Sequence, residues 1–191
     1  MVEFTLEACD PLEDMNLRFE ALTVQSVTGI AVVSIAIPSH GLDDVAARVR
    51  QAYGTSLPEV GHLTISNADD IRFLRLARDQ VFVLFKDPGH DPLAPISRQL
   101  GGLAYLVDQS DSWVMLSVEG AQARSALERI CPLDLDPRIF PEDRIARTVM
   151  EHVAVIILRS SYDRFLLLSP RSSAQSFAHA VRVSAENVSD G

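Results

Sequence analysis

The chain has 191 residues, of which 47% are hydrophobic, and 26 acidic against 17 basic side chains give it a formal net charge of −9. Its length suits one domain with a proper core. The acidic balance argues against nucleic acid or an anionic membrane surface as partner, because both bind clustered Lys and Arg. Either burial under a partner chain or a well-filled core explains the high apolar content.

Cysteine usage and the apolar runs indicate the compartment. Cys9 and Cys131 are far apart and lack C-x-x-C spacing, so neither a disulfide framework nor a zinc site is expected. The opening residues are acidic and do not resemble a signal peptide. The longest apolar run, residues 153–158, is too short to span a bilayer. We therefore expect a cytoplasmic protein without a membrane span.

In the first half of the chain, an irregular acidic arm precedes predicted strands and helices. The strands, which share β-branched and apolar residues, are predicted at 24–27, 30–37, 71–76 and 81–85. The helices, each with apolar residues at helical spacing and a glycine after its end, are predicted at 42–53 and 92–100. Residues 56–70 between them are predicted to be a loop.

The next stretch, residues 103–135, is the most informative part of the sequence. A buried strand over 113–118 runs into Glu119-Gly120, and an amphipathic helix follows until Cys131-Pro132, where proline ends it. The unit contains neither a nucleophile with its base nor a metal-ligand pair. We interpret it as a packing unit, which is typical of a subunit or binding domain.

The last third is predicted to contain a second hairpin and a helix. The segments follow in the order of an acidic loop at 132–144, strands at 148–158 and 165–168, and a helix at 173–184. Strand pairs that alternate with single helices, without a G-x-G-x-x-G motif, predict an α+β fold with helices packed on largely antiparallel sheet. The repeated hairpin–helix order suggests two related halves.

Three segments are therefore expected along the chain. They are an N-terminal arm over 1–22, a single α+β domain over 23–185 and a flexible tail over 186–191.

Two groups of residues have both a functional and a structural interpretation. Glu151 and His152 could form an acid/base couple, but neighbours on a strand point to opposite faces. Arg171 and the serines around it, beside the last helix, could hold a phosphate, and serine as a helix cap explains the same residues without a ligand. With no G-x-S-x-G motif and no cysteine–histidine pair, the sequence predicts no catalytic residue.

A third group lies in the acidic loop. Asp134, Asp136, Glu142 and Asp143 could in principle bind calcium, but they lack the spacing and central glycine of an EF-hand. A solvated turn explains them equally, and no metal site is predicted.

A set of short segments, densest from Leu103 to Val181, has a familiar order and spacing. The segments are Pro38, Arg78-Asp79-Gln80, Asp108-Gln-Ser-Asp-Ser-Trp113, Glu119-Gly120 with Ala123, Cys131-Pro-Leu-Asp-Leu135, Arg147-Thr-Val-Met-Glu-His152 and Phe165-Leu-Leu-Leu-Ser-Pro-Arg-Ser-Ser173. Together they resemble the gamma subunit of heterotetrameric sarcosine oxidase. That family is similar to the folate-binding aminomethyltransferase domain of the glycine-cleavage T-protein, which implies an aminomethyltransferase-like α+β fold.

The resemblance implies a non-catalytic accessory subunit of a flavoenzyme that oxidatively demethylates sarcosine and transfers the one-carbon unit to tetrahydrofolate. FAD, FMN, NAD and tetrahydrofolate would belong to the assembled complex, with no cofactor predicted on this chain. The implied partners are larger alpha and beta flavin-binding subunits and a small zinc-binding delta subunit. Trp113 and Phe140 are the candidate interface residues, because aromatics dominate interface energetics, although Trp113 could equally be core.

Two departures from the family patterns bear on function. Aminomethyltransferases carry an aspartate beside the folate, whereas the corresponding stretch here, residues 152–158, has no carboxylate and no glycine. This disfavours an independent folate-binding one-carbon transfer protein. Arg75 and Phe82 stand where gamma chains often have tryptophans, which leaves open the matching subunit of a related N-methyl amino acid dehydrogenase. A free-standing domain of other function also stays open.

Overall fold

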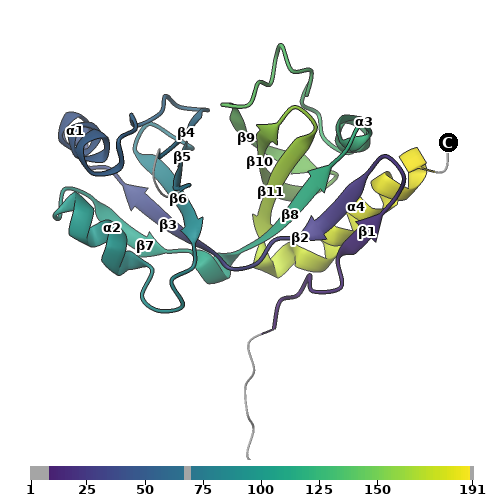
Figure 1. The fold of residues 1–191 in the computed structure, drawn as a ribbon, viewed down its shortest axis with the longest axis horizontal. Coiled ribbons are helices and arrows are strands. Elements are labelled where there is room, and N and C mark those ends of the chain that lie inside the picture. Colours follow the sequence, from purple (N-terminus) through teal and green to yellow (C-terminus); the bar gives the residue numbers. More distant parts are fainter. Residues whose placement is uncertain (1–8, 67–69, 190–191) are drawn as a thin grey trace, which may run out of the picture.

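The computed structural model describes residues 9–66 and 70–189, and these form two antiparallel sheets that pack face to face. Helices cover the outer face of each sheet, giving a helix–sheet–sheet–helix arrangement (Figure 1). The predicted α+β fold, with helices packed on antiparallel sheet, is confirmed. None of the helices in the described part of the chain is long and apolar enough to cross a membrane.

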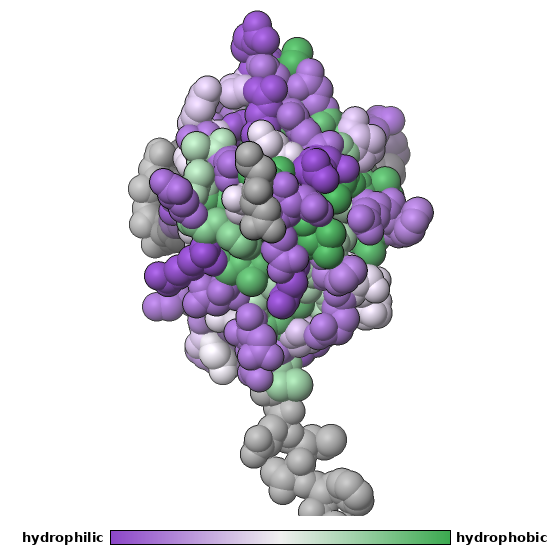
Figure 2. Space-filling view, turned by 90° about the vertical axis from the view of Figure 1, so that its right-hand side faces the viewer, coloured by the Kyte–Doolittle hydropathy of each residue, from purple (hydrophilic) through white to green (hydrophobic). Residues whose placement is uncertain are grey.

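The first sheet has six strands in the order β1-β2-β8-β11-β10-β9. These strands are β1 (Asn16–Arg18), β2 (Thr23–Ser26), β8 (Trp113–Glu119), β9 (Ile145–Met150), β10 (Val153–Ser161) and β11 (Arg164–Pro170). Its outer face is covered by α3 (Ala123–Glu128) and α4 (Ala174–Ser189), and the short 3₁₀ turn Arg171–Ser173 leads into α4. Viewed from the side that bears these helices, apolar side chains are scattered among hydrophilic ones (Figure 2).

The second sheet has five strands in the order β4-β5-β6-β3-β7. These strands are β3 (Ile30–Ala36), β4 (Leu63–Ile65), β5 (Arg72–Arg75), β6 (Gln80–Lys86) and β7 (Tyr105–Asp108). The helices over its outer face are α1 (Leu42–Tyr53) and α2 (Leu93–Leu100), and a 3₁₀ turn, Ser110–Ser112, connects β7 to β8.

Alternate side chains of the central strands enter two different cores. In β6, Val83 packs under the helices, whereas Phe82 and Leu84 face the other sheet. In β10, Ile157 faces the helices and Ile156 faces the other sheet. Successive residues of a strand point to opposite faces, so a strand covered on both faces needs an unbroken apolar run. This explains why the central strands read as apolar runs rather than alternating patterns.

Two consecutive segments of the chain have the same order of elements, and they exchange their first strands. The first segment runs β2-β3-α1-β4-β5-β6-α2, and the second runs β7-β8-α3-β9-β10-β11-α4. Strand β2 pairs with β8 of the second segment, and β7 pairs with β3 of the first. Each sheet therefore contains a strand from both segments, and the two halves are linked through backbone hydrogen bonds.

The sheets are also hydrogen-bonded along one edge. The N–H of Leu63 donates to the carbonyl of Asp143 at 2.8 Å, and the N–H of Ile145 donates to the carbonyl of Gly61 at 3.0 Å. A bridge between His62 and Arg144 completes this contact. Strands β4 and β9, which belong to different sheets, are thereby held side by side.

Four strand predictions need correction, and all four concern sheet edges. Strand β1 lies in the predicted irregular arm, β4 lies in the predicted loop 56–70, and β7 was not predicted. The predicted strand 148–158 is in fact two strands, because Glu151 and His152 form a turn between β9 and β10. Edge strands pair on one side and bury few side chains, so their sequences carry a weak β signal.

The predicted end of the last helix also needs correction. Helix α4 continues to Ser189 instead of ending at Ser184, so most of the predicted tail 186–191 is helical. Ala185 is fully buried and Val188 packs against the same core, which explains why the helix continues. The remaining residues, 190–191, lie outside the described part of the chain.

Gly120 is required by a close backbone approach. Its φ is +124°, and an added Cβ would lie 2.3 Å from the carbonyl oxygen of Ala21. We expect Gly120→Ala to lower the free energy of unfolding by about 3 kcal/mol or more, since a disfavoured φ alone costs roughly 1–3 kcal/mol and the clash adds to it. Gly29, at φ +70° with nothing within 4 Å of an added Cβ, is the matched control. In urea unfolding, Gly29→Ala should lower the free energy of unfolding by less than Gly120→Ala does. Equal losses of free energy in the two variants would contradict the role of the Ala21 contact.

Candidate functional site

Arginines hold the acidic loop between α3 and β9 together. Oδ1 of Asp136 accepts hydrogen bonds from the backbone N–H and Nε of Arg138 at 3.0 and 2.8 Å, and Oδ2 accepts one from Nη1 of Arg124 at 3.2 Å. Glu142 and Asp143 are exposed. Among the described residues, no group of three or more His, Cys, Asp or Glu is placed to hold a metal ion. In the described structure, the four acidic residues of this loop therefore do not come together as a calcium site.

Glu128 connects the helix α3 to this loop. Its Oε1 accepts hydrogen bonds from Nε of Arg124 and from the backbone N–H of Leu135, both at 3.0 Å. The pKa of Asp136 lies well below its ordinary value, mainly because Arg138 donates hydrogen bonds to this carboxylate. The carboxylates of this loop thus act as hydrogen-bond acceptors that fix its backbone.

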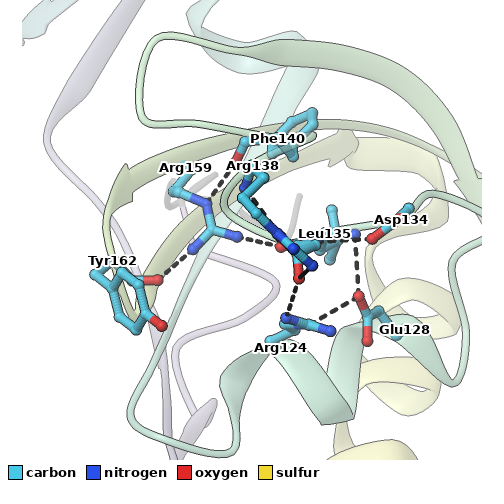
Figure 3. Close-up of polar contacts among 9 residues, drawn as sticks. Arg124, Glu128, Asp134, Leu135, Arg138, Phe140, Arg159 and Tyr162 are labelled. Atoms are coloured by element: carbon cyan, nitrogen blue, oxygen red, sulfur yellow. Dashed lines mark hydrogen bonds and ion pairs between the residues drawn. The ribbon is translucent and has the colours of Figure 1, made fainter.

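A buried arginine lies behind the same loop. The Arg159 side chain donates from Nε to the carbonyl of Phe140 at 2.7 Å, and its terminal nitrogens donate to the carbonyls of Leu135 and Tyr162 (Figure 3). The residue is 1% exposed, and its Cζ lies 4.5 Å from the centroid of the Phe165 ring. Burial is the main cause that lowers the pKa of Arg159, but an arginine stays charged at neutral pH.

The sequence signal that could have identified Arg159 is a charged residue that closes a long apolar run in β10. Arg159 makes no ion pair within the described part of the chain. Carbonyl dipoles therefore replace the water that its guanidinium loses on burial, which is how a buried charge without a counter-ion is satisfied.

The other predicted candidates do not form a catalytic pair. Glu151, at φ +52°, and His152 form an exposed turn, and no hydrogen bond joins them in the described structure. The Arg171 guanidinium donates to the carbonyl of Cys9. The buried hydroxyl of Ser169 donates to the carbonyl of Ala154 at 3.1 Å. The hydrogen bonds of Arg171 and Ser169 thus stabilise the chain itself.

A cleft of about 370 Å³ opens between the two sheets. The cationic residues of its lining are Arg72 at the start of β5, Lys86 at the end of β6 and Arg164 at the start of β11. Leu84 and Leu166 contribute apolar wall. This grouping was not predicted from the sequence, because its members come from strands far apart in the chain.

No family model matches this sequence. Two curated proteins match this sequence. Sarcosine oxidase subunit gamma of Corynebacterium sp. (strain P-1) is 27% identical over 139 residues, which is 72% of this chain and 66% of that protein. Sarcosine oxidase subunit gamma of Arthrobacter sp is 27% identical over 123 residues, which is 64% of this chain and 60% of that protein. The chain resembles sarcosine oxidase gamma subunits. The aligned regions span about two thirds or less of the relatives' length.

Solved structures show the same likeness in the fold. A chain of the heterotetrameric sarcosine oxidase from Corynebacterium sp. U-96 superposes with a TM-score of 0.77 at 23% identity, over 93% of this chain and 91% of that chain. The glycine cleavage system aminomethyltransferase T from Bartonella henselae superposes with a TM-score of 0.65 at 16% identity, over 84% of this chain and 45% of that chain. The resemblance of this chain to a gamma subunit with an aminomethyltransferase-like fold is confirmed.

Residues 152–158, the stretch compared in sequence with the folate-binding region of aminomethyltransferases, contain no carboxylate. Along this stretch Ile156 and Leu158 are buried in the core between the sheets, and Val155 and Ile157 are buried under the helices. The apolar side chains of residues 153–158 provide no carboxylate for a folate amine.

The two candidate interface residues lie in different environments. Trp113 is partly buried, and its ring meets that of Phe82 edge to face at 5.5 Å between centroids. Its buried Nε1 has no hydrogen-bond acceptor in the described structure. Phe140 is only 6% exposed and packs in the core under α3 and α4. Contact of either residue with another chain stays a prediction.

The Arg159 hydrogen bonds can be tested by removing the guanidinium. Arg159→Met keeps the aliphatic volume but leaves buried carbonyls without donors, so we expect a loss of about 3–5 kcal/mol in the free energy of unfolding. Arg50→Met, at an exposed position of α1, should change it by less than about 0.5 kcal/mol. Urea unfolding of both variants gives the comparison. A loss below about 1 kcal/mol for Arg159→Met would show that the carbonyls find other donors.

The Asp136 ion pairs predict a dependence of stability on pH. Because its folded-state pKa lies below the ordinary value of 3.8, its stabilisation is complete above pH 3.8 and is lost as the pH falls toward the folded pKa. Asp136→Asn should therefore destabilise the chain at neutral pH, and its difference from wild type should shrink on acidification below pH 3.8. Asp79→Asn, at an exposed carboxylate without an ion pair in the described structure, is the control. A difference for Asp136→Asn that stays constant with pH would contradict this account.

Proposed function

We propose that this chain is a non-catalytic accessory subunit of a sarcosine oxidase-like flavoenzyme. The observation that carries the proposal is 27% identity to two sarcosine oxidase gamma subunits. A chain of a heterotetrameric sarcosine oxidase also matches nearly end to end in fold. The complex would oxidatively demethylate sarcosine and pass the one-carbon unit to tetrahydrofolate.

In this proposal the reactive groups belong to the partners. FAD, FMN and NAD would be bound by larger alpha and beta subunits, and a small zinc-binding delta subunit would complete the complex. Two of the candidate ligand-binding residues are engaged in the structure of the chain itself. Asp136 is bound by two arginines, and Arg171 is bound to the carbonyl of Cys9.

Two alternatives differ in their support. Independent one-carbon transfer is not favoured, because residues 152–158 lack the carboxylate such a function would use. A subunit of an N-methyl amino acid dehydrogenase was suggested by Arg75 and Phe82. Arg75 donates to the carbonyls of Pro58 and Arg78 at 3.2 and 2.8 Å, and Phe82 is buried against Trp113. Both residues therefore have structural roles within this chain.

Purification of the tagged chain from its native host tests the subunit role. We expect a large, yellow, stoichiometric complex, measured by native mass spectrometry and visible absorption, because the flavins would come with the partners. An extract from the untagged host on the same resin is the control. A colourless monomer would overturn the proposal and make folate titration of the lone chain the next measurement.

The same preparation distinguishes the amine substrate. Anaerobic addition of sarcosine should bleach the flavin absorption if the complex oxidises sarcosine. Bleaching by N-methylglutamate, with none by sarcosine, would instead assign the chain to the related dehydrogenase.

A further inference from the structure

Three cations lie on the inner faces of the two sheets at one end of the space between them. Arg72 is opposite Leu84 in the β5–β6 ladder, and Lys86 follows Leu84 by two residues. Arg164 precedes Leu166 by two residues on β11. Because Leu84 and Leu166 belong to the core between the sheets, the period of two places all three cations on the same inner faces. They line one cleft of about 370 Å³.

The charges of this cleft do not balance. Arg72 lies 3.5 Å from the carboxylate of Asp70, and Arg164 donates from Nε and Nη2 to Oε2 of Glu119 at 2.9 and 2.6 Å. Lys86 has no hydrogen-bond or ion-pair partner within the described structure. Three cations thus meet two carboxylates, in a chain whose net charge is −9. The excess positive charge lies at the cleft and not over the surface as a whole.

The rest of the lining is partly apolar and partly polar. Val27 and Ile30 extend the apolar wall formed by the leucines, and Ser117 and Ser160 contribute hydroxyls. Asp70, the ion-pair partner of Arg72, also lines the cleft, so the anion would share Arg72 with it. The volume lies within the range of small-molecule sites, which combine apolar walls with a few placed polar groups. Cationic side chains beside such walls favour an anionic head on a compact apolar body.

We propose that this cleft binds a small organic anion, a carboxylate with a compact apolar or aromatic body, whose carboxylate contacts Lys86 and Arg72. The body would lie against Leu84 and Leu166 on the two facing sheets. The site does not rest on the proposed subunit role, since it is formed by residues of this chain alone.

Lys86 provides a selective probe, because it is the single lysine of the chain. Reductive methylation with ¹³C-formaldehyde labels Lys86 and the N-terminal amine, and it leaves the lysine charge intact. Benzoate is titrated at constant ionic strength, and the two methyl signals are followed by NMR. We expect a saturable shift of the Lys86 signal, with the N-terminal signal unchanged. Benzyl alcohol, which has a similar ring without the charge, should give no saturable shift.

Variants connect the signal to the cleft. Arg72→Gln should weaken benzoate binding about tenfold, as expected for one charge-assisted contact. Arg50→Gln, on the exposed face of α1, should leave the affinity unchanged. Lys86→Gln, followed by isothermal titration calorimetry, provides a second variant at an exposed position if Arg72→Gln folds poorly.

Two results would overturn the proposal. One is the absence of a saturable Lys86 shift with benzoate. The other is equal affinity in wild type, Arg72→Gln and Lys86→Gln, which would mean that benzoate binds elsewhere. The flavin content of the native complex is a separate measurement, so failure here leaves the subunit proposal to its own test.

Discussion

Burial of the two inner sheet faces against each other is the constraint on which the rest of the structure depends. Leu158 and Leu168 from one sheet and Leu74 and Phe82 from the other are almost fully buried in this shared core. Each sheet must then cover its outer face with helices, because its central strands are apolar on both sides. A half of the chain on its own would expose its inner face. The exchange of β2 and β7 builds the two sheets together and so prevents that separation.

The buried arginine belongs to the core on the outer face of the first sheet, together with Leu135, Phe140 and Phe165. The loop over residues 132–144 carries the chain from α3 to β9, where Ile145 and Gly61 join the edges of the two sheets. Arg159 fixes this loop through the carbonyls of Leu135 and Phe140, and Arg124 and Glu128 fix its opposite side (Figure 3). A charged residue at the end of an apolar strand thus contributes to the packing of the loop against the core under α3 and α4. The acidic residues around it belong to the same structural network.

The cleft is the place where this apolar packing stops. Beyond Leu84 and Leu166, the inner faces carry Arg72, Lys86 and Arg164 in place of further apolar side chains. Arg72 and Arg164 meet carboxylates here, and Lys86 is exposed to solvent. A charged side chain without a buried partner needs contact with solvent, so this end of the inner faces stays open.

The sequence by itself determined the central elements, the fold class and the likeness to gamma subunits. The helix 42–53 was predicted at its observed bounds because its apolar stripe, acidic first turn and following glycine all agree, and Gly54 adopts the left-handed conformation expected of a helix end. The buried strands were found because strands covered on both faces need long apolar runs, as in β6 and β10. Local sequence patterns are enough to predict these elements, because burial on one or both faces dictates which of their residues are apolar.

Only the tertiary structure decided the edge strands, the strand exchange and the cationic cleft. Strands β1, β4 and β7 gain their stability from one neighbour and bury little, so their residues carry no clear pattern. Arg72, Lys86 and Arg164 are brought together by strand register and by the facing of two sheets. Both are long-range properties, set by which strands pair and not by the residues next to each cation in the sequence.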